Sequence, residues 1–121
     1  MTYFKTKELT FWQKLLQVYW FTPKSYLLDE FILDQADLTI IRKNNTVFKA
    51  KLSSITTTYF VDDFQRREYT IIDTLGNKTR FKEIPDMLSV EEWVQITILL
   101  NASEAKYSKI IHWIRSLMGK R

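Results

Sequence analysis

Residues 37–52 read DLTIIRKNNTVFKAKL, and this stretch decides the fold class of the chain. Its first part, Asp37 to Lys43, is rich in β-branched residues, which favour strands over helices. Its last part, Thr46 to Leu52, alternates apolar residues with lysines, the two-residue period of a half-buried strand. Between them, Asn44 and Asn45 tolerate the positive φ of a tight turn. The stretch therefore predicts an antiparallel hairpin.

Strand-like segments of the same kind lie on both sides of this hairpin. The connections between them are too short for crossover helices, so the sheet is predicted to be antiparallel. Gly76 marks one of the turns. With the hairpin, about six strands are predicted, the others at Tyr26 to Leu33, Ile55 to Val61, Glu68 to Asp73 and Lys78 to Ile84.

Helical periodicity appears at the two ends of the chain, near 10–21, 89–100 and 104–118. The first two segments open with capping-box spacings, Thr10 with Gln13 and Ser89 with Glu92. The predicted fold is therefore α+β, an antiparallel sheet or partial barrel with an N-terminal helix and two C-terminal helices. Its predicted core contains Leu38, Ile40, Phe48, Ile55, Phe60, Ile71, Phe81, Trp93 and Ile96.

A chain of 121 residues is too short for two separate cores, so one domain over 1–121 is expected. It divides into an N-terminal helical segment (1–25), the antiparallel sheet (26–84) and a C-terminal helical segment (85–121). The longest apolar run, from Val18 to Phe21, is far below the ~20 residues of a membrane span. No signal peptide is recognised, so a cytoplasmic protein is expected.

The composition excludes several kinds of site. With no cysteine and a single histidine, thiolate chemistry and multi-histidine metal centres are absent, and no metal or cofactor is expected. His112 falls off the apolar stripe of its predicted helix, which indicates a solvated residue. We therefore expect no catalysis. The alternative, a small carboxylate-dependent enzyme, would use Asp62, Asp63 or Glu68 in a pocket that raises a pKa.

Positive charge concentrates at the two ends of the chain. Residues 1–25 carry a net charge of +3 and residues 104–121 a net charge of +4, whereas the segment between them is acidic. Basic ends with amphipathic helices are typical of binding to anionic membranes. The candidate residues for an anionic surface are Lys14, Lys49, Lys51, Arg80, Lys82, Lys106 and Lys109, and Lys5, Lys7, Lys120 and Arg121 add attraction.

The predicted helix near 10–21 has an apolar face wider than one side of a sheet needs. Phe11, Trp12 and Trp20 are its candidate apolar contacts. Three explanations remain open: the face packs on the sheet, forms a dimer interface, or lies in a membrane interface.

A nucleic-acid-binding barrel is a further alternative. Lys49, Lys51, Arg80 and Lys82 would contact phosphates, and an exposed Tyr59 or Tyr69 would stack on bases. The acidic middle of the chain argues against a continuous basic groove, so nucleic acid is not the expected partner.

One series of segments resembles bacterial pleckstrin-homology-like domains, over about residues 26–100. It runs through YLLDE (26–30), LTII (38–41), FKAKLSSI (48–55), YTIID (69–73), Gly76 and Phe81. Such domains have seven antiparallel strands followed by a capping helix, against about six strands predicted here. The resemblance implies a binding or assembly module, sometimes near membranes, without catalysis, and it transfers no functional residues.

Together these observations predict a non-enzymatic interaction module. Its expected partner is a protein, including a second copy of the chain, or an anionic membrane surface. In the second case the protein would be peripheral to the inner face of the membrane.

Overall fold

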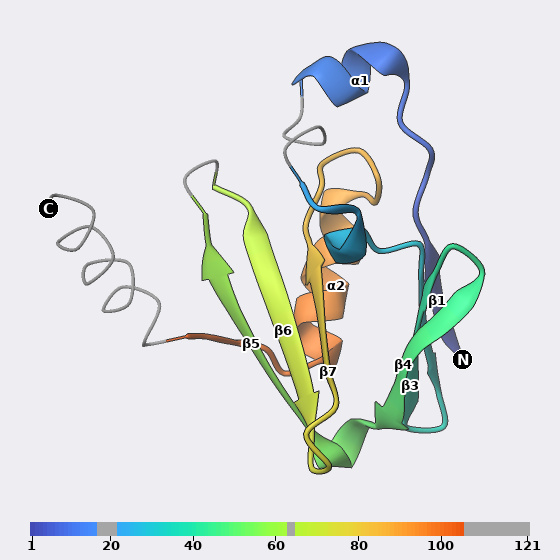
Figure 1. The fold of residues 1–121 in the computed structure, drawn as a ribbon, viewed down its shortest axis with the longest axis vertical. Helices are drawn as coiled ribbons and strands as arrows, with labels where there is room; N and C mark the ends of the chain where they lie inside the picture. The colour runs from blue at the N-terminus through green and yellow to red at the C-terminus, as the bar shows by residue number, and fades with distance from the viewer. Residues whose placement is uncertain (17–21, 63–64, 106–121) are drawn as a thin grey trace, which may run out of the picture.

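The computed structural model describes residues 1–16, 22–62 and 65–105, which form mostly strands (Figure 1). The strands make two four-stranded sheets, with the orders β1-β2-β3-β4 and β7-β6-β5-β8. The strands are β1 (Thr2–Lys5), β2 (Glu30–Asp34), β3 (Asp37–Arg42), β4 (Asn45–Lys51), β5 (Ile55–Val61), β6 (Arg67–Asp73), β7 (Lys78–Lys82) and β8 (Ser103–Glu104). The helices are α1 (Phe11–Leu16), α2 (Val90–Leu99) and the 3-10 turns η2 (Lys24–Tyr26) and η3 (Leu52–Ser54).

The predicted hairpin is β3 and β4 of the first sheet, paired in antiparallel register. Its turn lies one residue earlier than predicted, because Lys43 and Asn44 have positive φ, at 51° and 63°, while Asn45 already belongs to β4. Two consecutive positive φ values give the turn a twist that matches the strands. At the opposite edge of the same sheet, β1 pairs with β2 and places Phe4 opposite Phe31.

The second sheet contains the Gly76 turn, where φ is +88°. Asp73 closes this turn by accepting hydrogen bonds from the backbone N–H groups of Leu75 and Asn77, at 2.9 and 2.8 Å. At the other edge β8 pairs in parallel with β5, so the all-antiparallel prediction is wrong at this one contact.

The predicted α+β fold class is wrong, because the described residues are mostly strands and the predicted helices are largely missing from them. The described residues contain two four-stranded sheets and only one helix longer than six residues, α2, which carries the predicted capping box between Ser89 and Glu92. The predicted N-terminal helix is described only as the six-residue α1, and residues 17–21 lie outside the description. The residues predicted to begin the third helix form β8 instead, because their pairing with β5 overrides the local helical preference. Residues 106–121, with His112, also lie outside the described part.

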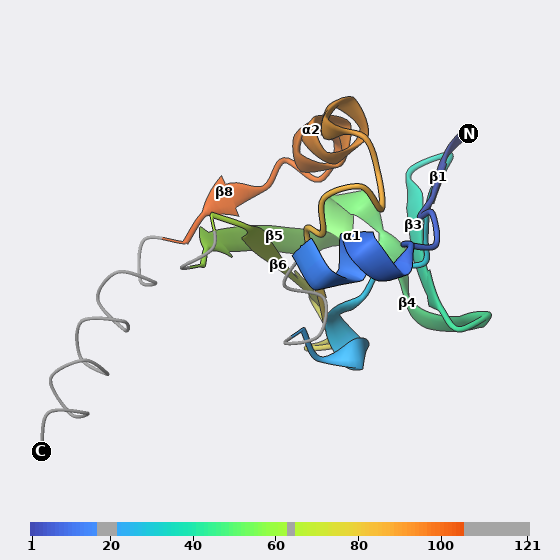
Figure 2. The same cartoon turned by 90° about the horizontal axis from the view of Figure 1, so that it is seen from above.

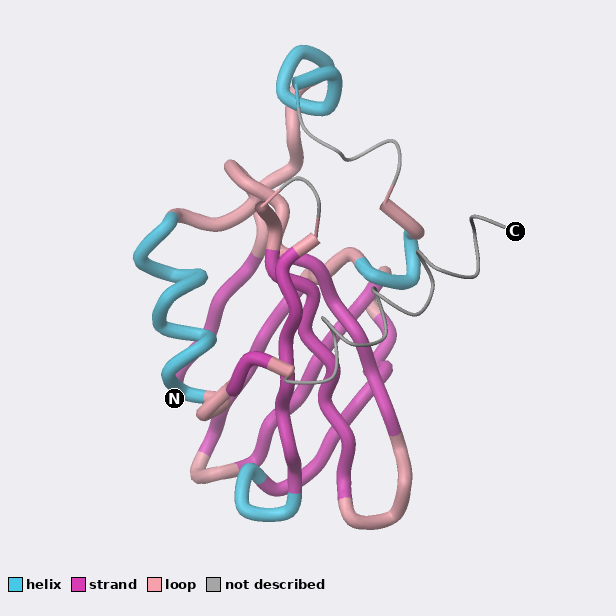
Figure 3. Tube along the Cα trace, turned by 90° about the vertical axis from the view of Figure 1, so that its left-hand side faces the viewer, coloured by secondary structure: helices cyan, strands magenta, loops and turns pink. Residues whose placement is uncertain are grey.

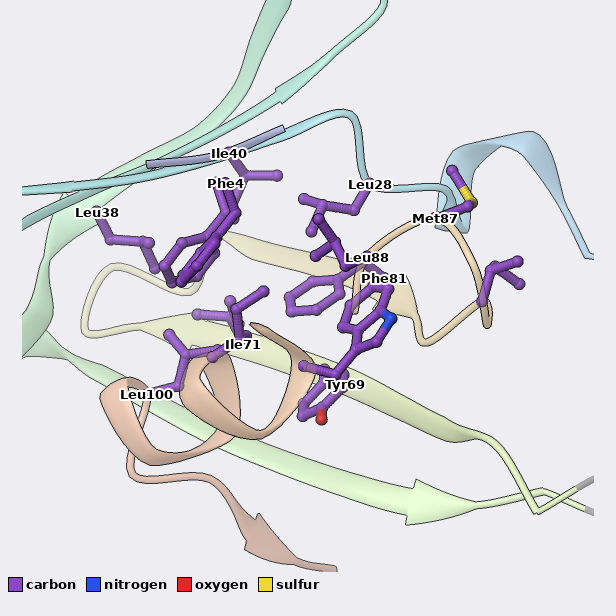
Figure 4. Close-up of a cluster of buried hydrophobic side chains, with 14 of the residues drawn as sticks. Phe4, Leu28, Leu38, Ile40, Tyr69, Ile71, Phe81, Met87, Leu88 and Leu100 are labelled. Carbon is purple, nitrogen blue, oxygen red and sulfur yellow. The ribbon is translucent and has the colours of Figure 1, made fainter. Parts of the chain in front are cut away.

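One hydrophobic core joins both sheets to α2. Figure 4 shows Phe4, Leu38 and Ile40 from the first sheet facing Ile71 and Phe81 from the second. Viewed from above, α2 lies in the corner between the sheets (Figure 2). Seven predicted core residues are buried, namely Leu38, Ile40, Phe48, Ile71, Phe81, Trp93 and Ile96, whereas Ile55 is only partly buried and Phe60 lies outside the core cluster.

Arg42 ties the two sheets together by hydrogen bonds. Its side chain leaves β3 and donates from Nε to the Leu27 carbonyl at 2.6 Å and from Nη2 to the Arg80 carbonyl on β7 at 2.9 Å. A planar guanidinium can make both bonds at once, which a lysine ammonium in this place could not do with the same geometry.

Candidate functional site

Helix α1 stands apart from both sheets, at one end of the molecule (Figures 1 and 3). Three of its large apolar side chains face solvent: Phe11 is 63% exposed, Trp12 is 72% and Leu15 is 51%. The rings of Phe11 and Trp12 meet edge to face, with centroids 5.7 Å apart. We call Phe11, Trp12 and Leu15 the apolar tip.

The chain just before α1 is anchored to the core, which fixes where the tip stands. Leu9 is buried, and the Lys7 N–H donates to the Met87 carbonyl at 2.7 Å. The helix then opens with the predicted capping box, in which the Thr10 N–H donates to Gln13 Oε1 at 2.9 Å and the Gln13 N–H to Thr10 Oγ1 at 3.2 Å. Within the described residues, the tip does not pack on a sheet, and Trp20 lies outside them.

A cavity of about 270 Å³ lies at the base of α1, where β1 leads into the helix. Its floor is apolar and includes the buried Leu9 and Met87, while charged side chains of both signs surround it. The lining residues are Lys5, Thr6, Lys7, Glu8, Leu9, Lys14, Leu27, Asp29, Glu30, Ile41, Asn44 and Met87.

Sequence reasoning included the lysines of this cavity but missed its carboxylates. Glu30 reaches the cavity because β1 pairs with β2 in a register that sets Lys5 opposite Glu30. Glu8 lies three residues after the end of β1, and Asp29 comes directly before β2. A pairing between segments 25 residues apart leaves no local signal in the sequence, so only the register of β1 could have revealed the cluster.

The other predicted basic residues do not form one surface with α1. Lys49 and Lys51 are exposed on the last residues of β4, which runs toward the end of the molecule away from α1 (Figure 1). On β7, Arg80 donates from Nη1 to the Tyr26 hydroxyl at 3.0 Å, and Lys82 forms an ion pair with Asp62. Lys106 and Lys109 lie outside the described residues. Of the predicted anionic-surface residues, Lys14 is the one that belongs to α1 and to the cavity.

The carboxylates named for an enzyme are engaged elsewhere. Asp62 is half-buried beside Lys82, and its Oδ1 accepts from the Arg66 N–H at 2.8 Å. Burial raises the pKa of Glu68. The positive charges of Lys82 and Arg80 partly oppose this rise. Neither Asp62 nor Glu68 lines the cavity at α1, and Asp63 lies outside the described residues.

Of the two aromatics named for base stacking, Tyr69 is enclosed by the fold and Tyr59 is partly buried. Tyr69 is fully buried, and its hydroxyl lies 2.5 Å from Thr97 Oγ1. Tyr59 packs against the core, and the Arg67 guanidinium lies 5.3 Å from its ring centroid. Tyr69 therefore cannot stack on a base without unfolding, and the stacking role predicted for it is wrong.

Across the described part of the chain, no helix is long and apolar enough to cross a membrane. The same residues contain no group of three or more histidines, cysteines or carboxylates arranged to hold a metal ion. Comparisons of the chain with protein-family models, with curated proteins and with solved structures found no match. The function is therefore inferred from the geometry of α1 and the residues around it.

Proposed function

We propose that this protein is a non-enzymatic module that binds an anionic phospholipid surface through the apolar tip of α1. The observation that carries the proposal is the exposure of Phe11, Trp12 and Leu15 within one six-residue helix at one end of the molecule. Scattered apolar residues are ordinary on protein surfaces, whereas a contiguous cluster is typical of an interaction site.

The chemistry of the tip suits the boundary between lipid head groups and acyl chains. Tryptophan has an apolar body and a polar N–H, and it is favoured at that depth. Phe11 and Leu15 would enter the apolar side, while Lys14 would extend its ammonium toward the phosphates.

The net charge of +4 of the whole chain supplies the electrostatic part of the attraction. Lys5, Lys7 and Lys14 line the cavity at the base of α1, where three carboxylates of the same cavity offset their charges. Each basic residue close to an anionic leaflet contributes about 1 kcal/mol, and salt screens this contribution. Lysines on β4 would stay clear of the same surface.

The order of elements supports the resemblance to pleckstrin-homology-like domains. Strands β1 to β4 form one antiparallel sheet, β5 to β7 continue in antiparallel order in the second, and α2 follows. Seven antiparallel strands and then a helix is the layout of that family, to which this chain adds α1 between β1 and β2 and β8 after α2. A binding module near a membrane is what the resemblance implies.

Sedimentation with phospholipid vesicles tests the proposal. The wild-type chain is expected to pellet with phosphatidylglycerol vesicles at low salt and much less with phosphatidylcholine vesicles. The double variant Phe11→Ala, Trp12→Ala should lose most of this binding, because the apolar insertion is removed. Leu75→Ala is the matched control, since Leu75 is 86% exposed in the turn after β6. Absence of wild-type binding to anionic vesicles at low salt contradicts the proposal.

The alternative partner is a protein, namely a second copy of the chain. An exposed apolar face of α2 favours it. Val90, Val94 and Ile98 are exposed at four-residue intervals on α2, on a different side from the buried Trp93 and Ile96. Ridges at this spacing interdigitate between two helices, and a second copy presents the same ridge. Sedimentation equilibrium of the wild type and of Ile98→Glu tests it: a monomeric wild type eliminates this alternative.

A further inference from the structure

The cavity at the base of α1 has a balanced set of charges. Three lysines (5, 7 and 14) and three carboxylates (Glu8, Asp29 and Glu30) line it. Lys5, Lys7 and Glu8 have no ion-pair partner among the described residues. Because Lys5, Lys7 and Glu8 share the cavity without pairing with each other, they suit a ligand that itself carries both signs. A simple anion or a simple cation would meet as much repulsion as attraction there.

The size of the cavity is sufficient for a small group. Pockets for drug-sized ligands begin at about 300 Å³, and this cavity of about 270 Å³ is slightly smaller. A small head group therefore fits within it. The apolar floor at Leu9 and Met87 would contact the short carbon linker of such a group.

The lining also distinguishes between two kinds of ammonium. Quaternary ammonium groups are recognised by the faces of aromatic rings, and none of the twelve described residues that line the cavity is aromatic. Carboxylates, in contrast, accept hydrogen bonds from a primary ammonium. Glu30 is held in place for this by the Tyr3 hydroxyl, which donates to its Oε1 at 2.5 Å. Asp29 is fixed by the Lys43 N–H, which donates to its Oδ2.

We propose that the cavity binds a phosphate group together with a primary ammonium, the chemistry of a phosphoethanolamine head group. The lysines would take the phosphate and the carboxylates the ammonium. Lys14 lies on α1 next to Leu15 of the apolar tip and also lines the cavity, so a head group in the cavity would belong to a lipid beside the inserted tip. This inference rests on the proposed function when the ligand is a lipid, and it is independent of that function when the ligand is soluble.

The lipid test compares two vesicle types with the same fraction of phosphatidylglycerol. One contains phosphatidylethanolamine as the second lipid and the other phosphatidylcholine. The wild type should bind the first about tenfold more tightly, the effect expected of a hydrogen bond to a charged group. Glu8→Gln should abolish this preference while retaining binding to both vesicles. Glu91→Gln, on the exposed first turn of α2, is the control and should keep the preference.

A soluble test separates the site from the membrane. Glycerophosphoethanolamine is titrated against the whole chain, and amide NMR shifts are expected at residues 5–9; glycerophosphocholine should give far smaller shifts. Equal binding of the two vesicle types, or a preference that persists in Glu8→Gln, overturns the site and leaves membrane binding intact. NMR shifts without vesicle binding retain the site and overturn the proposed function. The absence of both NMR shifts and vesicle binding overturns the site and the proposed function together.

Discussion

At the scale of single residues, the turn between β2 and β3 departs from ordinary turn chemistry. Gln35 and Ala36 occupy it with positive φ, at 48° and 71°. Glycine, asparagine and aspartate are the usual residues for such a turn, because a β-carbon crowds the backbone at positive φ. The position is nevertheless fixed, since the Ala36 carbonyl accepts from the Leu52 N–H at 2.7 Å.

We expect Ala36→Gly to stabilise the protein by about 1 kcal/mol, because it relieves the left-handed strain of an alanine. Urea unfolding followed by circular dichroism measures the change in the free energy of unfolding. Ala50→Gly is the control: Ala50 lies within β4, where glycine adds backbone entropy to the unfolded chain and should destabilise. Destabilisation by Ala36→Gly would show that the turn does not hold the strain described.

At the scale of elements, β6 and β7 bring a half-buried carboxylate next to a half-buried ion pair. Glu68 on β6 lies opposite Lys82 on β7, which is also the partner of Asp62. Burial raises the pKa of Glu68 above the ordinary value of 4.5, although Lys82 and Arg80 oppose the rise. Between those two pKa values the folded state binds more protons than the unfolded state, so the Glu68 contribution to stability falls as pH rises.

We therefore expect the change in the free energy of unfolding caused by Glu68→Gln, relative to wild type at the same pH, to favour the folded state more at pH 7 than at pH 4. Below the ordinary pKa both side chains are largely neutral, whereas as pH rises above it the wild type loses the stability that protonated Glu68 contributes and the glutamine variant does not. Paired urea titrations at the two pH values measure the difference between the free energies of unfolding.

Asp73 provides a control of opposite sign for this experiment. Desolvation there works against ionisation, but hydrogen bonds from Asn77, Leu75 and Gly76 outweigh it and lower the pKa of Asp73. Its contribution to stability is present above the unfolded pKa and is lost as pH falls through the folded pKa. Asp73→Asn should therefore cost more at pH 7 than at pH 4. The same sign for both variants would contradict the burial assigned to Glu68.

How far the elements could be predicted depends on how local their signals are. The hairpin at 37–52, the Gly76 turn and α2 follow from neighbouring residues, through β-branching, turn preference and a capping box. Strand β1 was missed, because its four residues include a single buried side chain, Phe4, whose partner Phe31 is 27 positions away. The same distant pairing assembles the cavity, which is why its carboxylates were missed too.

The start of the C-terminal segment was misjudged for a different reason. Ser103 followed by an amphipathic pattern is typical of a helix N-cap, yet Ser103 and Glu104 lie alongside Thr58 and Tyr59 of β5. The edge of β5 offers backbone groups that a short segment can pair with, and that tertiary opportunity does not appear in the local sequence. For the apolar tip, the sequence identified Phe11 and Trp12 but could not decide whether they would be covered.

At the scale of the whole molecule, the single core makes the two sheets dependent on each other. Ile71 of the second sheet is fully buried in the cluster that includes Leu38 and Ile40 of the first. Stacked rings extend this core from Tyr69 through Phe81, with centroids 4.8 Å apart, and on to Trp93 of α2.

We expect Ile71→Ala to destabilise the protein by about 2–5 kcal/mol, the usual range for emptying a buried isoleucine site. Unfolding should remain a single transition, because no sheet keeps a core of its own when the other is lost. Tryptophan fluorescence, which includes the buried Trp93, and far-ultraviolet circular dichroism should give coincident curves. Ile72→Ala is the matched control on the same strand, since Ile72 is 42% exposed. Two separated transitions would contradict the shared core.

The parallel pairing of β8 has a consequence for how copies of the protein behave in a crowded solution. An outer strand with unsatisfied N–H and C=O groups is a template on which other chains can add in register and grow into fibres. On β5 the middle of that template is already occupied, by Ser103 and Glu104 and by the Ala105 N–H, which donates to the Tyr59 carbonyl at 2.8 Å. An incoming strand would therefore have to displace this two-residue strand before it could pair with the middle of β5.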